Sequence, residues 1–261
     1  MSKKYKDDGK KIEKSIAYII TSFLFFVGFF LGILVKVLFP TEYTEQYRQT
    51  RSGGYEYINP LVDFESIESA KVGELFALQK ELDEYVSNTT EDYNATKVSH
   101  ISIYYKDLNS GGWIGVNENE KFSPASLLKL PIMIATYKLA EIDPTILTTE
   151  VEFRRKEERI YQIVEPEETL IEEQIYTIDT YIERLIKYSD NNAIEPILSS
   201  LEYTELANVY KDLGIPNPYE TEAEDVMTVK DYASFFRILY NASYLNKDMS
   251  TKALKLLAET N

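Results

Sequence analysis

The sequence contains no cysteine and only one histidine, His100, among its 261 residues. The absence of cysteine excludes disulfide bonds and thiolate metal sites, and a single histidine excludes a conventional histidine-rich zinc centre. We expect no metal ion and no cofactor at a functional site. Acid–base chemistry in this chain has to depend mainly on lysine, serine and carboxylate side chains.

Basic residues are scarce relative to acidic ones. The chain has 28 Lys and Arg against 43 Asp and Glu, which gives a net charge of −15 at pH 7. A protein that binds nucleic acid needs a basic surface for the phosphates, so we expect no nucleic-acid partner. The basic residues that exist are concentrated at the start, where residues 1–14 carry six lysines. The 44% apolar content is typical of a globular protein.

Residues 16–39 form a long apolar run in which Lys36 is the only charged residue. A helix that crosses a bilayer needs about 20 apolar residues, and the lysine can extend to the interface. The basic segment 1–14 precedes this run, which predicts a cytoplasmic N-terminus. A cleaved signal peptide is the alternative, but its apolar region is shorter, about 7–15 residues, and ends in small residues. We therefore predict that residues 15–39 form one uncleaved transmembrane anchor.

The anchor is followed by two regions of different character. Residues 40–56 are polar with a Gly-Gly pair, which predicts a linker, and residues 57–261 are predicted to form one domain. Residues 98–107 alternate in polarity and are rich in aromatic and β-branched side chains, as in a strand. A Gly-containing turn leads to a returning strand that begins at Trp113, which we expect to lie in the core. The pattern predicts a β-hairpin.

Several further segments carry helix signals. Residues 69–85 have apolar residues at helical spacing, and residues 127–139 are apolar nearly all round, which predicts a helix buried inside the domain. Hydroxyl side chains that can cap a helix precede three later patterns, and a glycine ends another; these four residues are Thr177, Thr228, Ser250 and Gly214. One hairpin among many helices predicts an α+β fold.

Ser126 and Lys129 stand three residues apart at the start of the predicted buried helix. Residues at this spacing share one helix face, and backbone amides at a helix start are unpaired and can polarise a carbonyl group. Burial lowers the pKa of a lysine, so Lys129 could accept the Ser126 proton near neutral pH. The pair alone is a weak signal, because a solvated helix face often carries the same spacing.

Ser189, Asp190 and Asn191 follow sixty-odd residues later, at the end of a helical pattern. All three residue types also cap helices, and the next helix could begin at Asn192. Both interpretations can hold together. Asp190 would then stabilise the loop backbone, while Ser189 and Asn191 face a cleft.

The two patches and the hairpin that precedes Ser126 carry a family resemblance. Residues 122–129, Phe-Ser-Pro-Ala-Ser-Leu-Leu-Lys, and residues 188–193, Tyr-Ser-Asp-Asn-Asn-Ala, resemble motifs of the serine β-lactamase and penicillin-binding protein superfamily. The chain is most similar to class A β-lactamases, over roughly residues 70–261. The resemblance implies a β-lactamase/transpeptidase-like fold, with a helical subdomain beside an antiparallel sheet. With the predicted anchor and the basic segment before it, we expect a bacterial cell-membrane location with this domain outside the cytoplasm.

The same resemblance implies a role for each motif residue. Ser126 would be the acylated nucleophile, and its backbone amide would form half of an oxyanion hole. Lys129 would activate Ser126, and Ser189 would relay a proton to the leaving nitrogen. Asn191 would hold an amide of the substrate, and Asp190 would be structural.

Two departures from the family pattern bear on activity. The third motif, Lys-Thr/Ser-Gly on a strand, is absent, so we expect an incomplete sheet and a chain truncated at its C-terminal side. The glutamate that activates water for deacylation in class A enzymes also has no recognisable counterpart. The loop after Gly214 carries four carboxylates, which we expect to be solvated rather than catalytic: Glu220, Glu222, Glu224 and Asp225.

Three functions remain open from the sequence. The first is a β-lactam hydrolase acting through an acyl-enzyme on Ser126. The second is a D,D-peptidase acting on peptidoglycan stem peptides with the same nucleophile, which the missing glutamate favours. The third is a catalytically inactive, β-lactamase-like domain that binds the cell wall, which the missing third motif favours.

Overall fold

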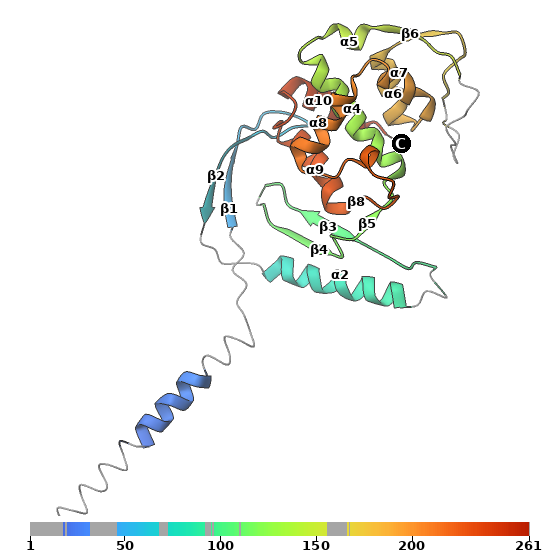
Figure 1. Ribbon diagram of the computed structural model, residues 1–261. Helices are drawn as coiled ribbons and strands as arrows, with labels where there is room; N and C mark the ends of the chain where they lie inside the picture. The colour runs from blue at the N-terminus through green and yellow to red at the C-terminus, as the bar shows by residue number, and fades with distance from the viewer. Residues whose placement is uncertain are drawn as a thin grey trace, which may run out of the picture. The chain divides into compact units, whose positions relative to one another are not determined.

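The computed structural model divides the chain into two units, Met1–Thr44 and Glu45–Asn261 (Figure 1). The described residues are 18, 20–31, 46–67, 73–91, 95, 97–109, 111–155, 166 and 168–260. In the first unit, residues 20–31 are helical with exposed side chains. The described chain contains no helix that is both long and apolar enough to span a bilayer. Residues 1–14 and the remainder of the predicted anchor 15–39 lie outside the described residues, except Tyr18.

The second unit contains four two-stranded antiparallel sheets among its described residues. The paired strands are β1 (Gln46–Arg51) with β2 (Leu61–Ile67), β3 (Ile103–Lys106) with β4 (Trp113–Val116), β5 (Lys121–Phe122) with β8 (Met227–Thr228), and β6 (Glu150–Glu152) with β7 (Ile175–Thr177). Strand β1 lies inside the predicted linker 40–56.

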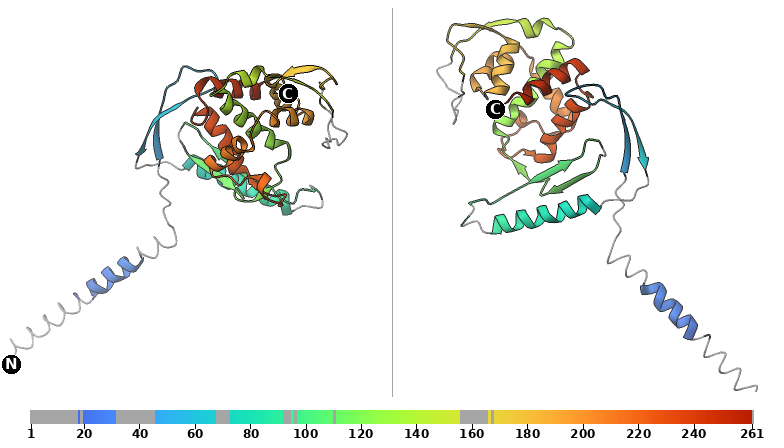
Figure 2. Two further views of the ribbon diagram at one scale, coloured as in Figure 1. Left: turned by 45° about the horizontal axis from the view of Figure 1, so that its top comes forward. Right: turned by 180° about the vertical axis from the view of Figure 1, so that it is seen from behind.

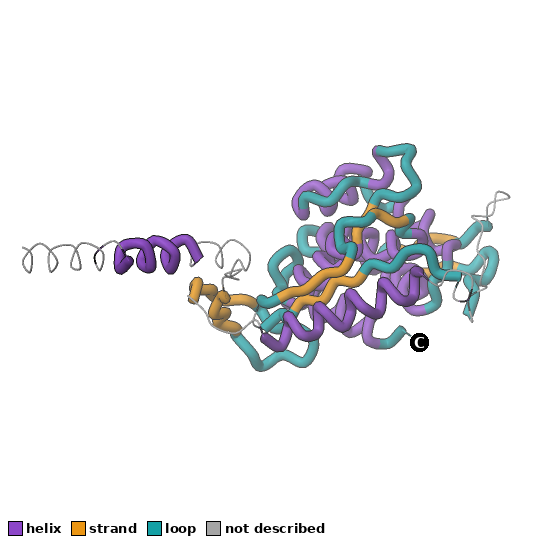
Figure 3. Tube along the Cα trace, turned by 90° about the horizontal axis from the view of Figure 1, so that it is seen from below, coloured by secondary structure: helices purple, strands orange, loops and turns teal. Residues whose placement is uncertain are grey.

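The predicted hairpin is present as β3 and β4, with Tyr104 opposite Gly115. It lies between the helix α2 (Gly73–Glu91) and the helix α9 (Val229–Tyr240) (Figures 2 and 3). Trp113 was expected in the core, but it is 45% exposed. Its side chain lies on the face of the hairpin with Tyr104, where the Lys230 ammonium covers its ring at 4.8 Å. Alternation along the strand placed Trp113 on one face, but it did not reveal how far α9 covers that face.

A buried helix organises the rest of the unit. The 3₁₀ helix η1 (Ala125–Leu128) continues into α4 (Lys129–Ala140), as the apolar run of residues 127–139 predicted. Ten of the twelve residues of α4 are buried, because other helices pack against it on several sides. These are α5 (Thr145–Thr148), α6 (Ile178–Lys187), α7 (Ile194–Leu198), α8 (Tyr203–Leu213) and α10 (Lys247–Ala258). The first residue of this buried helix is Lys129.

Local capping chemistry accounts for most helix ends. Thr177 accepts a hydrogen bond from the Thr180 amide and begins α6, and Gly214 ends α8 with a φ of +66°. Thr228 and Asp231 form the predicted capping box at α9. Ser250 was predicted as the N-cap of the last helix, and this prediction was wrong by four residues. Asn246 caps α10 through the Met249 amide, and an asparagine is as good a cap as a serine.

The capping box at α9 gives a stability prediction. Replacing Thr228 by Ala is expected to lower the free energy of unfolding by about 1 kcal/mol, because the Asp231 amide loses its acceptor. Urea denaturation of the variant measures this loss. Thr251→Ala is the matched control, since that hydroxyl bonds only the Lys247 carbonyl within α10. An equal loss in both variants would contradict a specific capping contribution.

Candidate active site

Ser126 lies in the first turn of η1, where backbone amides have no partner within the helix. The preceding residue, Ala125, has a φ of +44°, a left-handed conformation that costs a residue with a Cβ about 1–2 kcal/mol. This turn leaves the Ser126 side chain exposed at the end of the buried helix α4. Lys129, one turn further on, is only 6% exposed. The two side chains thus occupy the boundary between the protein core and solvent.

Ser189 lies in a second strained turn, at the end of α6. Its φ is +53°, and the turn is closed by a hydrogen bond from the Asp190 amide to the Arg184 carbonyl at 3.2 Å. Strained residues of this kind persist where the surrounding structure fixes them, and they concentrate at functional sites. The turn brings Ser189 to the start of η1, although 63 residues separate it from Ser126.

Ser126, Ser189 and Lys129 form a short hydrogen-bonded chain. The Lys129 Nζ atom donates to the Ser189 Oγ atom at 2.7 Å and to the Ser189 carbonyl oxygen at 2.5 Å. The Ser189 hydroxyl lies 3.4 Å from the Ser126 Oγ atom. Ser189 is therefore in hydrogen-bonding range of both partners. The sequence predicts that Lys129 acts directly on Ser126, whereas in the structure hydrogen bonds connect the two side chains through the Ser189 hydroxyl.

The surroundings of Lys129 favour its neutral form. Burial lowers the pKa of the Lys129 ammonium to about 8, and the charge of Asp190 opposes this shift. A lysine with this pKa is partly deprotonated near neutral pH and can accept a proton from a hydroxyl group. The geometry and the pKa together make Lys129 a candidate general base.

Asp190 is fully buried next to this chain of hydroxyls. Its Oδ1 atom accepts hydrogen bonds from the Asn192 amide at 2.9 Å and from the Asn192 Nδ2 atom at 2.8 Å. These bonds cap the 3₁₀ helix η2 (Asn191–Ala193), which leads into α7. Asn191 is the first residue of η2 and is half-buried, directly after the turn that carries Ser189. The side chain of Asp190 thus stabilises the backbone on which Ser189 and Asn191 are placed.

The acidic loop after α8 does not contribute a buried carboxylate. Glu220, Glu222, Glu224 and Asp225 are all exposed. The Glu220 carboxylate accepts hydrogen bonds from the Tyr203 hydroxyl and the Asn217 amide, next to the 3₁₀ helix η3 (Pro218–Glu220). Among the residues that the structure describes, no three His, Asp or Glu side chains converge as a metal site would require.

The backbone strain at Ala125 and Ser189 was not anticipated from the sequence. Neither alanine nor serine favours a positive φ, so no local signal marks these positions. An indirect signal exists in Pro124, since proline is typical of turns and precedes the strained alanine.

Comparison with known proteins identifies the family of this chain. The family model described as the Beta-lactamase enzyme family matches residues 77–261, which include both serine motifs. The chain belongs to this family. A comparison with curated protein sequences found no match.

Solved structures support the same fold for the β-lactamase-family domain. A mutant of PBP-A, in an acyl-enzyme complex with penicillin G, superposes with a TM-score of 0.57 at 21% identity, over 71% of this chain and 70% of that one. A β-lactamase from Francisella tularensis gives a TM-score of 0.54 at 18% identity, over 69% of each chain. A class A β-lactamase from Mycobacterium abscessus gives 0.55 at 17% identity, over 69% of this chain and 70% of that one. At these identities the likeness establishes a β-lactamase/transpeptidase-like α+β fold.

Proposed function

We propose that this protein is a membrane-anchored, extracytoplasmic serine hydrolase that opens β-lactams through an acyl-enzyme on Ser126. The observation that carries the proposal is the hydrogen-bonded chain from the buried Lys129, through Ser189, to the exposed Ser126 hydroxyl. A serine with an adjacent base of lowered pKa is the arrangement that nucleophilic catalysis requires. The PBP-A structure, an acyl-enzyme complex with penicillin G, supports β-lactams as the acylating class.

With this geometry, acylation would take place in two steps, each of which moves two protons. In the first, the Ser126 Oγ atom attacks the lactam carbonyl carbon while its proton passes to Ser189 and the Ser189 proton passes to the neutral amine of Lys129. The Ser126 backbone amide stabilises the negative charge on the carbonyl oxygen. In the second step, the carbon–nitrogen bond breaks, Ser189 gives a proton to the leaving nitrogen, and Lys129 returns one to Ser189. The products are an ester on Ser126 and an opened ring.

This route predicts how acylation depends on pH. Lys129 accepts a proton only as the neutral amine, and its pKa of about 8 means that this form becomes dominant above about pH 8. The acylation rate of the protein with penicillin should therefore rise by about tenfold per pH unit below the pKa and level off above it. Rapid-quench measurements between pH 6 and pH 9 test this profile. A rate that is flat across this range would contradict the role of Lys129 as base.

Peptidoglycan stem peptides are a second candidate substrate class, which a D,D-peptidase would process. The observation that favours it is the exposure of Glu220, Glu222, Glu224 and Asp225. A carboxylate that activates water for deacylation needs to lie against the ester, whereas these four carboxylates are exposed on the loop after α8. A long-lived penicilloyl ester is compatible with a peptidase, whereas a β-lactamase has to release it rapidly.

One experiment separates these candidates. The protein is incubated with penicillin and, separately, with a model peptide ending in D-alanyl-D-alanine. Multiple turnovers of penicillin would identify a β-lactamase, and release of D-alanine with a stable penicillin adduct would identify a peptidase. The absence of both reactions on folded protein would contradict the proposed hydrolase, and would favour the inactive, cell-wall-binding alternative.

The proposed location rests on the sequence. Residues 15–39 are predicted to cross the cell membrane once, and the lysine-rich residues 1–14 favour a cytoplasmic N-terminus. The β-lactamase-like domain would then act on substrates outside the cytoplasm. Alkaline carbonate extraction of membranes tests the anchor. We expect the protein to remain in the membrane pellet, and its release into the soluble fraction would contradict the anchor.

A further inference from the structure

The turn that carries Ser189 is held from two sides. On one side, Lys129 bonds the hydroxyl and the carbonyl of Ser189. On the other side, the Arg184 carbonyl oxygen accepts hydrogen bonds from the Tyr188 amide at 3.3 Å and from the Asp190 amide at 3.2 Å. These two amides flank Ser189, so one carbonyl of α6 fixes the backbone before and after the strained residue.

The side chain of Arg184 returns to the same turn. Its guanidinium group lies over the Tyr188 ring, 5.1 Å from the ring centroid, which is within the range of a cation–π interaction. The Arg184 side chain is only 22% exposed, and such contacts are stronger where water is excluded. Tyr188 directly precedes Ser189. The position of its ring therefore constrains the backbone that enters the left-handed turn.

A carboxylate fixes the guanidinium group in this position. Arg184 forms an ion pair with Glu168, which lies in the chain segment between β6 and β7. This segment is itself anchored two residues later, where Leu170 is 2% exposed in the core. A guanidinium group can pair through its N–H groups and stack through its face at the same time. Arg184 can thus contact Glu168 and Tyr188 together, which a lysine could not do as well.

The two sides of the turn behave differently during the proposed reaction. Lys129 alternates between ammonium and neutral amine, and its bond to the Ser189 carbonyl is weaker without the charge. An arginine does not deprotonate in proteins, so the Arg184 contacts keep their strength throughout. The Ser189 hydroxyl has to remain close to the Ser126 Oγ atom, at 3.4 Å in the structure, while the protons move. A misplacement of about 1 Å can slow a reaction by about 10²-fold.

We propose that Arg184 is a positioning residue that holds the Ser189 hydroxyl in place for the proton relay from Ser126. It acts through the ring of Tyr188 and is itself held by Glu168. The proposal rests on the proposed function, because the relay matters only if Ser126 is acylated. Arg184 is not a catalytic residue in this account, since its described contacts are with the turn and with Glu168.

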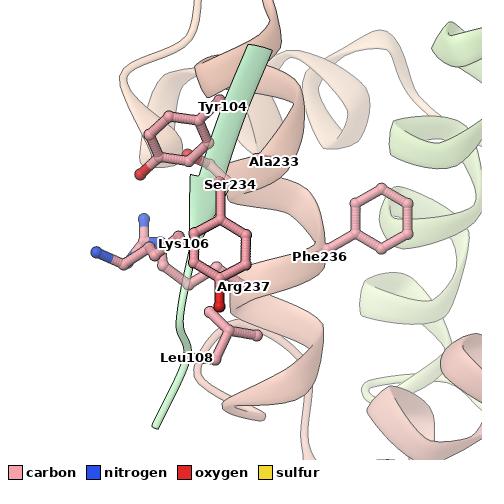
Figure 4. Close-up of a pocket in the computed structure, with 8 residues that line it drawn as sticks. Tyr104, Lys106, Leu108, Ala233, Ser234, Phe236 and Arg237 are labelled. Carbon is pink, nitrogen blue, oxygen red and sulfur yellow. The ribbon is translucent and has the colours of Figure 1, made fainter. Parts of the chain in front are cut away.

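The cavity between β3 and α9 is separate from this arrangement. It has a volume of about 280 Å³, and Figure 4 shows Tyr104, Lys106 and Arg237 among the residues that line it. Its lining, among the described residues, includes none from α6 or from the two serine motifs. Arg237 is therefore an arginine whose loss should not reach the Ser189 turn.

The rate of acylation at a series of penicillin concentrations tests the proposal on the whole 261-residue chain in detergent. Arg184→Met keeps a long side chain but removes the cation. It should lower the maximal acylation rate by about tenfold and leave the penicillin concentration for half-maximal rate within about twofold, because the relay operates only after penicillin is bound. Tyr188→Leu removes the ring and should give the same loss. Tyr188→Phe keeps the ring and should acylate as fast as the wild-type protein.

Two controls remove a cation elsewhere. Lys187 lies in the same last turn of α6, its side chain is 21% exposed, and it pairs with Glu183 at 3.0 Å and Glu259 at 2.6 Å. Lys187→Met therefore removes ion pairs of similar exposure from the same helix. Lys187→Met and Arg237→Met should both keep the maximal acylation rate within about twofold of the wild-type value.

A double variant decides whether Arg184 acts through Ser189. In Ser189→Ala the relay hydroxyl is absent, so adding Arg184→Met should slow acylation by no more than about a further twofold. Thermal melting verifies folding, and Tyr188→Leu replaces Arg184→Met in the same cycle if the latter does not fold. A purely structural role would lower the melting temperature and leave the maximal rate of the folded protein unchanged.

The possible results separate this proposal from the proposed function. An unchanged maximal rate in Arg184→Met, an equal loss in Lys187→Met, or a full tenfold loss that persists in the Ser189→Ala background would each overturn the positioning role alone. A folded wild-type protein that forms no adduct with penicillin would overturn the proposed function, and the positioning role with it.

Discussion

Replacing Lys129 by Ala is expected to slow acylation of the protein by penicillin by about 10³-fold. General base catalysis by a positioned side chain contributes about 10²–10⁴-fold, and the Lys129 amine bonds Ser189 directly. The buried Lys129 ammonium also stabilises the turn at Ser189, because it donates a hydrogen bond to the Ser189 carbonyl. The measurement is the rate of adduct formation followed by rapid quench and intact mass.

Two controls separate catalysis from folding in this experiment. Lys138→Ala changes a lysine of the same helix, where the side chain bonds Glu141 and the Tyr244 carbonyl, and it should leave the acylation rate unchanged. Lys129→Arg keeps the positive charge, but an arginine does not deprotonate in proteins, so this variant should be as slow as the alanine variant. Thermal melting verifies that each variant is folded. A fast Lys129→Arg variant would show that charge alone, rather than proton transfer, supports the reaction.

Replacing Ser189 by Ala is expected to lower the acylation rate by about 10²-fold or more. The described hydrogen bonds between Ser126 and Lys129 pass through the Ser189 hydroxyl, so its removal interrupts both the activation of Ser126 and the protonation of the leaving nitrogen. Rapid-quench rates with penicillin measure the effect, and Ser199→Ala, at an exposed site after α7, is the control.

The backbone at this position allows a second variant. Because Ser189 has a φ of +53°, Ser189→Gly removes the hydroxyl but relieves the strain that Ala retains. Both variants should be equally slow, while the glycine variant should be more stable than the alanine variant by about 1 kcal/mol. If the glycine variant recovered the acylation rate, Ser189 would act through its backbone conformation rather than as a proton relay.

Local sequence signals predicted the parts of the fold that depend on neighbours in sequence. Thr177, Thr228 and Gly214 mark helix ends because capping and left-handed termination use backbone groups within a few residues. The buried helix α4 followed from a run with no polar face. Asn246 was missed because Ser250, four residues later, is an equally good cap by type, and only packing decides between them.

Tertiary features were less accessible from the sequence. The exposure of Trp113 depends on how α9 lies across the hairpin, which no pattern in β4 encodes. The motif spacing selected Ser126, Lys129 and Ser189 as candidates, and the structure places the three side chains next to one another. It did not give the route of the hydrogen bonds, because that route depends on the left-handed turns at Ala125 and Ser189. The turn at Ser189 is held in part by Lys129, which lies 60 residues away in the sequence.

The most direct test of the account is the intact mass of the protein after incubation with penicillin, followed by mapping of the modified peptide. The account predicts one penicilloyl adduct per chain, located on Ser126, and no adduct in the Ser126→Ala variant. Circular dichroism of both proteins confirms that they are folded. An adduct that persists in Ser126→Ala, or the absence of any adduct on the folded wild-type protein, would contradict the assignment of Ser126 as the nucleophile.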